Sequence, residues 1–225
     1  MLQREAAPLR TQLVNQLRED IIAGRYKAGD RLTEKVLEAA FGVSRTVVRE
    51  ALRQLESESL VETVPNVGPR VRALTYNDVA NLYQVRLALE AAACRLAATL
   101  ATDEQIQDLV EAFRLLVTKA PEKAPESLVQ DKNEFYQALI AASGNPIIGE
   151  MLANVQARIA QLRFITLGQP GRSAAMLEEL RAVVSAIESR DPLAAVAAAT
   201  LHVEAAGAIA LNHVAHLRNP QEAIA

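Results

Sequence analysis

The sequence predicts a mainly α-helical protein in two parts: three helices and a β-hairpin in residues 1–74, then an all-α bundle of about six helices in residues 75–225. Half of the 225 residues are hydrophobic but only 4% are aromatic, a composition that favours helices over sheet. Apolar residues recur at helical spacing through most of the chain. Runs typical of β-strands occur just before residue 75.

The first helix is predicted over residues 9–23, where apolar residues recur at every fourth position, and Gly24 ends it. After a turn, Thr33 is expected to cap a short helix that runs to Phe41. Gly42 then provides the tight turn into the third helix.

The third helix lies in the run GVSRTVVREALRQLE and begins at Ser44, its expected N-cap. Its apolar residues follow the i, i+3, i+4, i+7 spacing of a core-facing stripe, namely Val48, Ala51, Leu52 and Leu55. A second set of residues lies on a neighbouring face, about 110° round the helix, and consists of Arg45, Arg49 and Arg53. These arginines are either the solvated side of a packed helix or a surface meant for an anion.

A β-hairpin is predicted next, because LVETV and RVRAL are typical of strands and PNVGP between them is typical of a turn. Three helices and a hairpin, with a glycine turn between the second and third helices, form a winged helix-turn-helix. In this motif the third helix enters the DNA major groove with its N-terminal residues at the base edges. The flanking elements therefore favour DNA as the anion.

On this interpretation Arg45 can bond a guanine through two hydrogen bonds, worth about 1–3 kcal/mol of base discrimination. The hydroxyls of Ser44 and Thr46 can reach phosphates or bases, and Arg49 follows the sugar–phosphate backbone. The wing is expected to approach the backbone or the minor groove through Asn66, Gly68 and Arg70.

From residue 75 onward the whole pattern is helical. Asn77 is expected to cap a helix that runs to about residue 100, and Thr102 with Gln105 forms a capping box for the next helix. The last helix is expected to begin at an Asp191 cap, with Pro192 at its first position. Helices are predicted over residues 126–143, 146–167, 173–190 and 191–214. Helices joined by such short loops are typical of a bundle.

Charge and composition narrow the class of protein. Residues 1–74 hold 12 basic and 10 acidic residues, a net charge of +2, whereas residues 75–225 hold 12 and 17, a net charge of −5. Cys94 is the single cysteine, which excludes an internal disulfide framework. We expect a cytoplasmic protein, because the first residues do not resemble a signal peptide and the longest uncharged stretches are shorter than the ~18 residues of a membrane span.

The run LTEKVLEAAFGVSRTVVREALRQLESESLVETVPNVGPRV resembles the DNA-binding domain of the GntR family of bacterial transcription regulators. The resemblance implies a set of DNA-contacting residues, namely Lys35, Ser44, Arg45, Thr46, Arg49 and Gly68. This chain departs from the family pattern at Val47, where proline is usual, at Ser59, where glycine is usual, and at Val67, a wing position that is often basic.

Three later segments resemble the helical FCD-type effector domain of the FadR-like branch of that family: LYQVRLALEAAACRLAA, DKNEFYQALIAASGNPII and LEELRAVVSAIESRDPLAAVAAATLHVEAA. The resemblance implies a divalent metal held by one Asp and three His, with an organic acid beside it. Here Lys132 falls where the Asp is expected, although Asp131 is adjacent, and Tyr136 and Leu180 replace two histidines. His202 alone cannot hold a transition metal, so we expect no metal cofactor.

A cavity without a metal can still bind a carboxylate through guanidinium and ammonium groups. We therefore expect a small, organic-acid-like effector bound by some of Arg86, Lys132, Asn133, Tyr136, Arg158, Arg163 and His202. The alternative for each cation is an intrahelical ion pair or a dimer contact, and the alternative for His202 is a satisfied buried histidine.

Together these features predict a sequence-specific DNA-binding repressor, a homodimer on a palindromic operator in double-stranded DNA, whose affinity the effector alters. The alternative is a ligand-independent architectural DNA-binding protein with a helical dimerisation module. An enzyme is not expected, since the sequence offers no nucleophile–base pair, no phosphate-binding glycine loop and no intact metal set.

Overall fold

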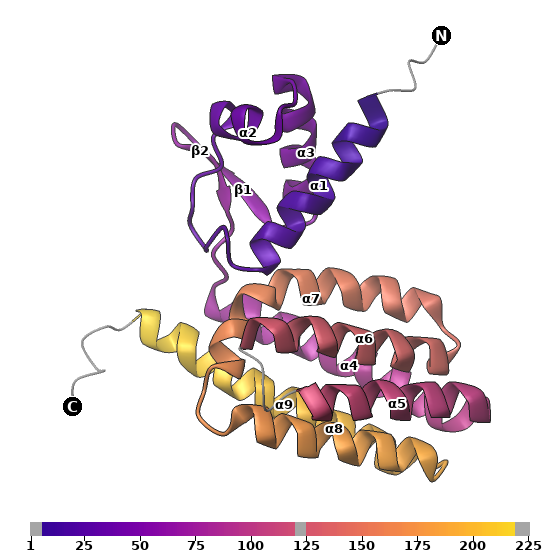
Figure 1. Cartoon of the computed structure of the whole chain (residues 1–225). Coiled ribbons are helices and arrows are strands. Elements are labelled where there is room, and N and C mark those ends of the chain that lie inside the picture. The colour runs from indigo at the N-terminus through magenta and orange to yellow at the C-terminus, as the bar shows by residue number, and fades with distance from the viewer. Residues whose placement is uncertain (1–5, 120–124, 219–225) are drawn as a thin grey trace. The chain divides into compact units, whose positions relative to one another are not determined.

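A computed structural model describes residues 6–119 and 125–218, and within these ranges the chain forms nine helices and one antiparallel hairpin (Figure 1). The side chains of residues 6–8, 119, 125–131, 161, 163–165, 217 and 218 lie outside the description. The chain divides into two compact units, Met1–Leu74 and Thr75–Ala225. The predicted fold class is confirmed.

The first unit is a winged helix-turn-helix. Its elements are α1 (Ala6–Ile22), α2 (Glu34–Phe41), α3 (Arg45–Ser57), β1 (Val61–Val64) and β2 (Gly68–Val71). The predicted apolar stripe of α3 is buried, and α3 packs against α1, α2 and β1. The core of this unit is completed by Leu13, Leu17, Ile21, Leu37, Leu60 and Val71.

The turn between α2 and α3 forms as the sequence predicts. Gly42 ends α2 in the left-handed region, with a φ of 63°, and its amide donates to the carbonyl of Glu38. Ser44 is the N-cap of α3, and its hydroxyl accepts a 3.4 Å hydrogen bond from the amide of Val47. These two residues set the direction in which α3 leaves the turn.

The hairpin differs slightly from the prediction. Its second strand begins at Gly68, because Val64 pairs with Gly68 and the amide of Val67 donates to the carbonyl of Val64. The turn is therefore shorter than the predicted PNVGP, with Asn66 in the left-handed region at its tip.

The second unit is a six-helix bundle within the described residues. Its helices are α4 (Tyr76–Leu100), α5 (Asp103–Lys119), α6 (Pro125–Ser143), α7 (Pro146–Leu167), α8 (Arg172–Glu188) and α9 (Pro192–Arg218). Helix α4 packs along α9 and also contacts α6, α7 and α8. Phe135 is fully buried near the centre, edge-on to Phe113 and Tyr136.

One of the predicted caps in the bundle is wrong and two are confirmed. Thr75, rather than Asn77, caps α4, because its side chain and that of Asp78 form a reciprocal capping box. The predicted box of Thr102 and Gln105 is present. The predicted cap of the last helix is also present, since the carboxylate of Asp191 accepts hydrogen bonds from two amides of the first turn of α9.

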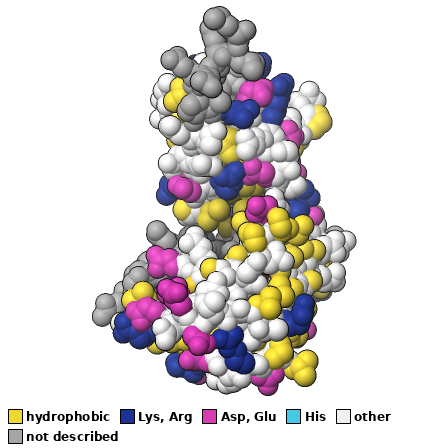
Figure 2. Space-filling view, turned by 90° about the vertical axis from the view of Figure 1, so that its right-hand side faces the viewer, with side chains coloured by type: hydrophobic (Ala, Val, Ile, Leu, Met, Phe, Trp, Pro, Cys, Tyr) yellow, Lys and Arg dark blue, Asp and Glu magenta, His cyan; other side chains and the backbone are white. Residues whose placement is uncertain are grey.

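Helix α9 is apolar over most of its length. Among the described residues, its segment Pro192–His216 is long and apolar enough to cross a membrane by length and composition only. It packs along α4 and α8 as a core helix of the bundle does. Figure 2 shows hydrophobic side chains gathered on one side of this unit. Exposed large hydrophobic residues on α4 and α9 are Tyr76, Val85, Leu100, Leu193 and Leu201.

Candidate DNA interface and buried polar cluster

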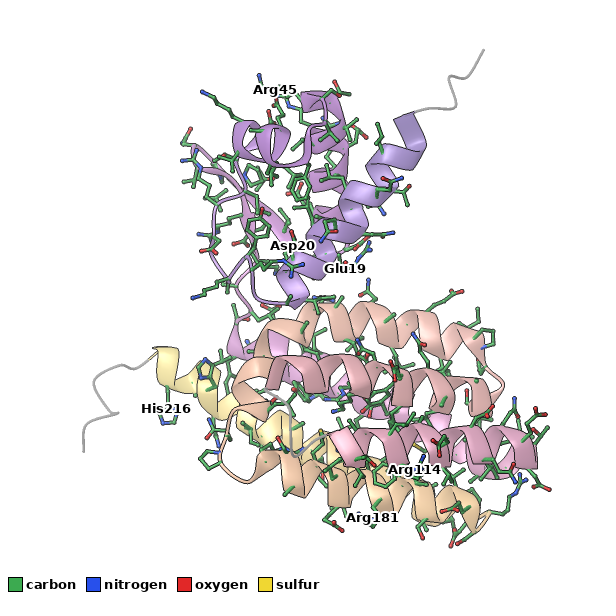
Figure 3. The ribbon with its side chains drawn as sticks, viewed as in Figure 1. Glu19, Asp20, Arg45, Arg114, Arg181 and His216 are labelled. Atoms are coloured by element: carbon green, nitrogen blue, oxygen red, sulfur yellow. The ribbon has the colours of Figure 1, made fainter. Side chains whose placement is uncertain are left out.

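The N-terminal turns of α3 present an exposed basic surface. The side chains of Arg45 and Arg49 are 64% and 53% exposed, and Ser44 and Thr46 are exposed beside them. Figure 3 shows Arg45 at the edge where α2 and α3 meet. These four predicted DNA contacts therefore lie together and face outward, and Lys35 on α2 is exposed as well.

Both arginines form ion pairs with one carboxylate that the sequence analysis did not select. Arg45 Nε lies 2.5 Å from Glu34 Oε2, and Arg49 Nε lies 2.7 Å from Glu34 Oε1. Hydrogen bonds from Arg49 and Arg45 hold the pKa of Glu34 below its usual value. Glu34 is 11 and 15 positions from its partners and on another helix, so helical periodicity gives no signal for this contact.

The predicted wing residues lie on the hairpin. Asn66 is exposed at the tip, and Arg70 Nε pairs across the two strands with Glu62 Oε1 at 2.6 Å. Arg31, also missed by sequence reasoning, forms a backbone bridge with Arg70. Its terminal nitrogen lies 4.0 Å from the position that a Cβ on Gly68 would occupy, so it adds a cation beside the wing.

The second unit contains a buried polar cluster drawn from α4, α6 and α9. Arg86 Nε donates to Glu90 Oε1 at 2.6 Å, and Tyr136 Oη donates to Glu90 Oε2 at 2.9 Å. The guanidinium of Arg86 also donates to Tyr136 Oη at 3.0 Å. Burial alone would raise the pKa of Glu90, but the charge of Arg86 holds it below its usual value.

His202 Nε2 faces three members of this cluster. It lies 3.3 Å from Tyr136 Oη, 3.4 Å from Lys132 Nζ and 3.5 Å from a terminal nitrogen of Arg86. These separations exceed the roughly 2.9 Å of a typical N–H···O hydrogen bond. Lys132 and Arg86 therefore both approach His202 Nε2, and neither forms a short hydrogen bond with it.

The other ring nitrogen of His202 fixes its protonation. His202 Nδ1 lies 2.7 Å from Glu179 Oε2, and Arg172 holds both oxygens of Glu179 at 2.6 and 2.8 Å. Burial, and then the charge of Lys132, lower the pKa of His202 to about 4. At neutral pH the imidazole is uncharged, with its proton on Nδ1 and Nε2 as an acceptor.

Sequence reasoning missed Arg172 and Glu179, which lie seven positions apart on α8. Of the other predicted effector residues, Asn133 is half-buried beside Lys132 on α6. Arg158 on α7 has a buried Nε that finds no hydrogen-bond partner in the part of the chain that the structure describes. Two further side chains lie outside the described residues, those of Arg163 and Asp131.

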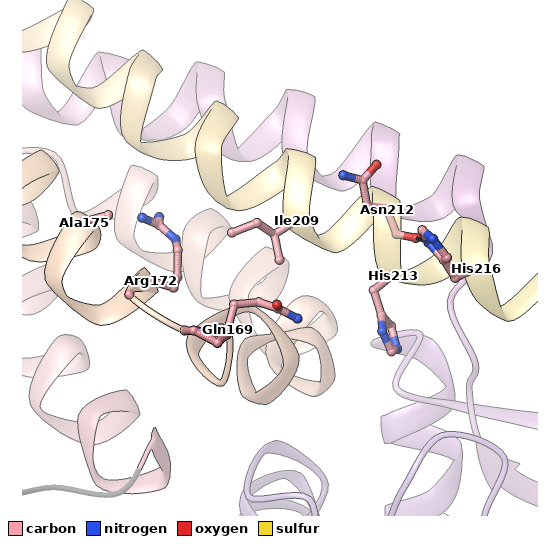
Figure 4. A pocket seen from close by; sticks show the side chains of 9 residues that line it. Gln169, Arg172, Ala175, Ile209, Asn212, His213 and His216 are labelled. Atoms are coloured by element: carbon pink, nitrogen blue, oxygen red, sulfur yellow. Dashed lines mark hydrogen bonds between the residues drawn. The ribbon is translucent and has the colours of Figure 1, made fainter. Parts of the chain in front are cut away.

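A pocket of about 670 Å³ opens where the turn before α8 meets α9 (Figure 4). Gln169 lines it from the turn, and Ile209 and His213 line it from α9. Arg172 belongs both to this wall and to the chain of contacts that runs through Glu179 to His202. The pocket wall is thus joined to the buried cluster by charged hydrogen bonds.

The donor set around His202 does not suit the metal that the resemblance implies. A divalent cation needs several anionic or neutral ligands, whereas two cations, Arg86 and Lys132, lie within 3.5 Å of His202 Nε2. Among the described residues, no group of three or more His, Cys, Asp or Glu side chains is close enough to bind a metal.

A winged helix-turn-helix with an outward basic surface, followed by a helical unit that contains a buried polar cluster, is the arrangement expected of a two-domain DNA-binding transcriptional regulator. Residues 9–71 match the family model of bacterial regulatory proteins of the gntR family, and residues 81–205 match the FCD domain. The chain belongs to the GntR family and carries an FCD domain.

Named relatives agree with this assignment. The chain is 26% identical over 197 residues to the HTH-type transcriptional repressor RspR of Escherichia coli, covering 88% of this chain and 86% of the relative. It is 29% identical over 201 residues to a probable D-xylose utilization operon transcriptional repressor of Paenarthrobacter nicotinovorans, covering 87% and 88%. These relatives are transcriptional regulators and not enzymes.

The fold also matches a solved structure, McbR/YncC of E. coli, with a TM-score of 0.78 over 95% of this chain and 99% of that one. The sequence identity is 22%, so this match supports the fold alone.

The buried ion pair makes the second unit sensitive to the loss of one partner. Replacing Glu90 by Gln leaves the Arg86 guanidinium buried without its counter-charge, and we expect a loss of about 3–5 kcal/mol in the free energy of unfolding. The double replacement Arg86→Met with Glu90→Leu removes both charges and should lose clearly less. Urea unfolding measures both values. A Glu90→Gln variant as stable as the parent would contradict the assignment of this pair.

Proposed function

We propose that this protein is a sequence-specific, DNA-binding transcriptional repressor whose FCD domain binds a small carboxylate and thereby changes operator affinity. The DNA-reading part is supported by one observation above all: Arg45 and Arg49 are exposed on the first turns of α3, next to the exposed hydroxyls of Ser44 and Thr46. A recognition helix reads base edges from this end. Two relatives are named as repressors, which supports repression rather than activation.

The operator is a palindrome bound by a homodimer. One recognition helix contacts only a few base pairs, and two helices related by a twofold axis read half-sites about one helical turn apart. The exposed apolar side chains on α4 and α9, such as Val85 and Leu201, favour a second copy of the helical unit as the partner, because such patches mark interaction surfaces.

The effector is a small organic acid bound without a metal. Arg86 and Lys132 both approach His202 Nε2, a neutral acceptor at 3.4–3.5 Å. A carboxylate oxygen placed between these donors forms hydrogen bonds in which donor and acceptor are both charged, which a neutral imidazole cannot form. Tyr136, whose pKa is raised by burial, stays protonated and supplies a further polar group to the same site.

Ligand binding alters DNA affinity only through a difference between states. A carboxylate that draws Arg86 or Lys132 away from His202 also changes the contact of His202 with Glu179, which Arg172 holds in turn. Coupling of this kind is typically about 1–3 kcal/mol, or 5–150-fold in affinity. In a repressor, the acid lowers operator affinity, so the protein leaves the operator and transcription of the gene is no longer repressed.

The DNA interface is tested with two arginines of the same helix. Arg45→Ala should weaken operator binding by about 10-fold or more and relax the preference at one base pair, because a bidentate arginine–guanine contact is lost. Arg53, which is 73% exposed and lies two turns further along α3, is the control. Arg53→Ala should affect operator and random duplex alike. Fluorescence anisotropy on a panel of single-base variants measures this, and equal base preferences in the two variants would refute the assignment.

The effector site is tested by thermal shift with a panel of small carboxylic acids, with and without a chelator. At least one acid should raise the melting midpoint of the helical unit by preferential binding to the folded state, and the chelator should leave that shift unchanged. Lys132→Met should abolish the shift. Arg181→Met, which removes an exposed cation on α8, should retain it. A protein that responds to DNA but to no acid is the architectural binder instead, and a chelator-sensitive shift would refute the metal-free site.

A further inference from the structure

Two arginines that the DNA interpretation needs share a single carboxylate, and this is unexpected on a surface meant for phosphates. The two oxygens of Glu34 are divided between them, with Oε2 on Arg45 and Oε1 on Arg49. A carboxylate at such a surface repels the DNA backbone, so its presence needs a physical explanation.

Stability supplies only a small part of that explanation, through the favourable interaction of an acidic side chain with the N-terminus of its own helix. The side chains of Arg45 and Arg49 are more than half exposed, and exposed ion pairs contribute little to folding. Glu34 is in the first turn of α2, and that helix is anchored in the core by Leu37. The hydrophobic core therefore fixes the position of Glu34, and the effect of Glu34 is on the two exposed arginines at the surface.

The atoms that form the two ion pairs show which edge of each guanidinium remains open to DNA. Both pairs use Nε of the arginine, which leaves the two terminal NH2 groups of each guanidinium for DNA. An arginine can meet guanine either end-on, through its two terminal nitrogens, or side-on, through Nε and one terminal nitrogen. Glu34 occupies the side-on edge of both residues.

We propose that Glu34 is a positioning residue that determines base specificity: it holds Arg45 and Arg49 so that their terminal NH2 groups meet the DNA end-on. A fixed guanidinium loses less freedom on binding, and its hydrogen bonds form in one geometry. The same carboxylate cancels one positive charge of the surface and so weakens binding to DNA of any sequence. This inference rests on the proposed function, because it requires a DNA operator.

The variant Glu34→Gln separates positioning from charge. Its amide offers one acceptor oxygen, so it can satisfy one arginine, while its NH2 group faces the other. Glu38→Gln is the matched control: Glu38 is on the same helix and its charge also acts on Arg45, but the ion pairs of both arginines are made with Glu34.

The experiment uses the full-length protein, the duplex that the parent protein selects from a random pool, and a scrambled duplex of equal length. Glu34→Gln should bind the scrambled duplex more tightly and the selected duplex less tightly, so that the ratio of the two affinities falls by about 10-fold or more. Glu38→Gln should strengthen both complexes alike and keep the ratio. In a background that carries both Arg45→Ala and Arg49→Ala, Glu34→Gln should have little further effect on the ratio, because both partners of Glu34 are gone.

An affinity ratio in Glu34→Gln equal to that in Glu38→Gln would overturn the proposal and leave Glu34 as a simple negative charge. Far-UV circular dichroism and melting curves establish that each variant is folded. A parent protein that selects no duplex from the pool refutes the proposed function itself, and that result is separate from any behaviour of Glu34.

Discussion

The buried polar cluster of the helical unit is organised by one imidazole, His202, whose Nδ1 is hydrogen-bonded to Glu179 and whose Nε2 faces two cations. Glu179 accepts the hydrogen bond of Nδ1, so Nε2 is left as an acceptor and the ring is neutral. Buried cations can gather at such an acceptor only if other groups balance their charge, and Glu90 does this for Arg86. Arg86 and Lys132 therefore lie close together in the buried cluster, and the proposed effector site rests on these two cations.

The DNA-binding unit also pairs its cations with a carboxylate, in this case at its surface. Its arginines must be free to meet DNA and yet must hold a defined direction. The core stripe of α3 fixes the helix, the turn at Gly42 and Ser44 fixes its start, and Glu34 contacts the two arginines that face outward. In both units a carboxylate orients cations: Glu90 does so in a buried site and Glu34 in an exposed one.

Local patterns predict the elements well, because apolar spacing, caps and turn residues act over a few positions. Ser44 and Gly42 are examples. The cap of α4 differs from the prediction by two positions, since both Thr75 and Asn77 are good N-caps and Asp78 decides between them.

Contacts between helices are the part that the sequence does not predict. Glu34 reaches Arg45 and Arg49, and Glu179 reaches His202, only because of how the helices meet in space. Arg172 reaches Glu179 along α8 over two helical turns, a spacing that the sequence analysis did not consider. Arg86 and His202 are instead selected as candidate effector residues from the family resemblance. The structure places both in one cluster with Tyr136 and Lys132.

The central claim is that α3 reads a DNA sequence, and capture of genomic fragments on the purified protein tests it most directly. The fragments are sequenced after washes at two salt concentrations. The account predicts one short palindrome, enriched at both salts, because base contacts persist when phosphate contacts are screened. Diffuse recovery that disappears at the higher salt would mean phosphate binding alone and would contradict the account.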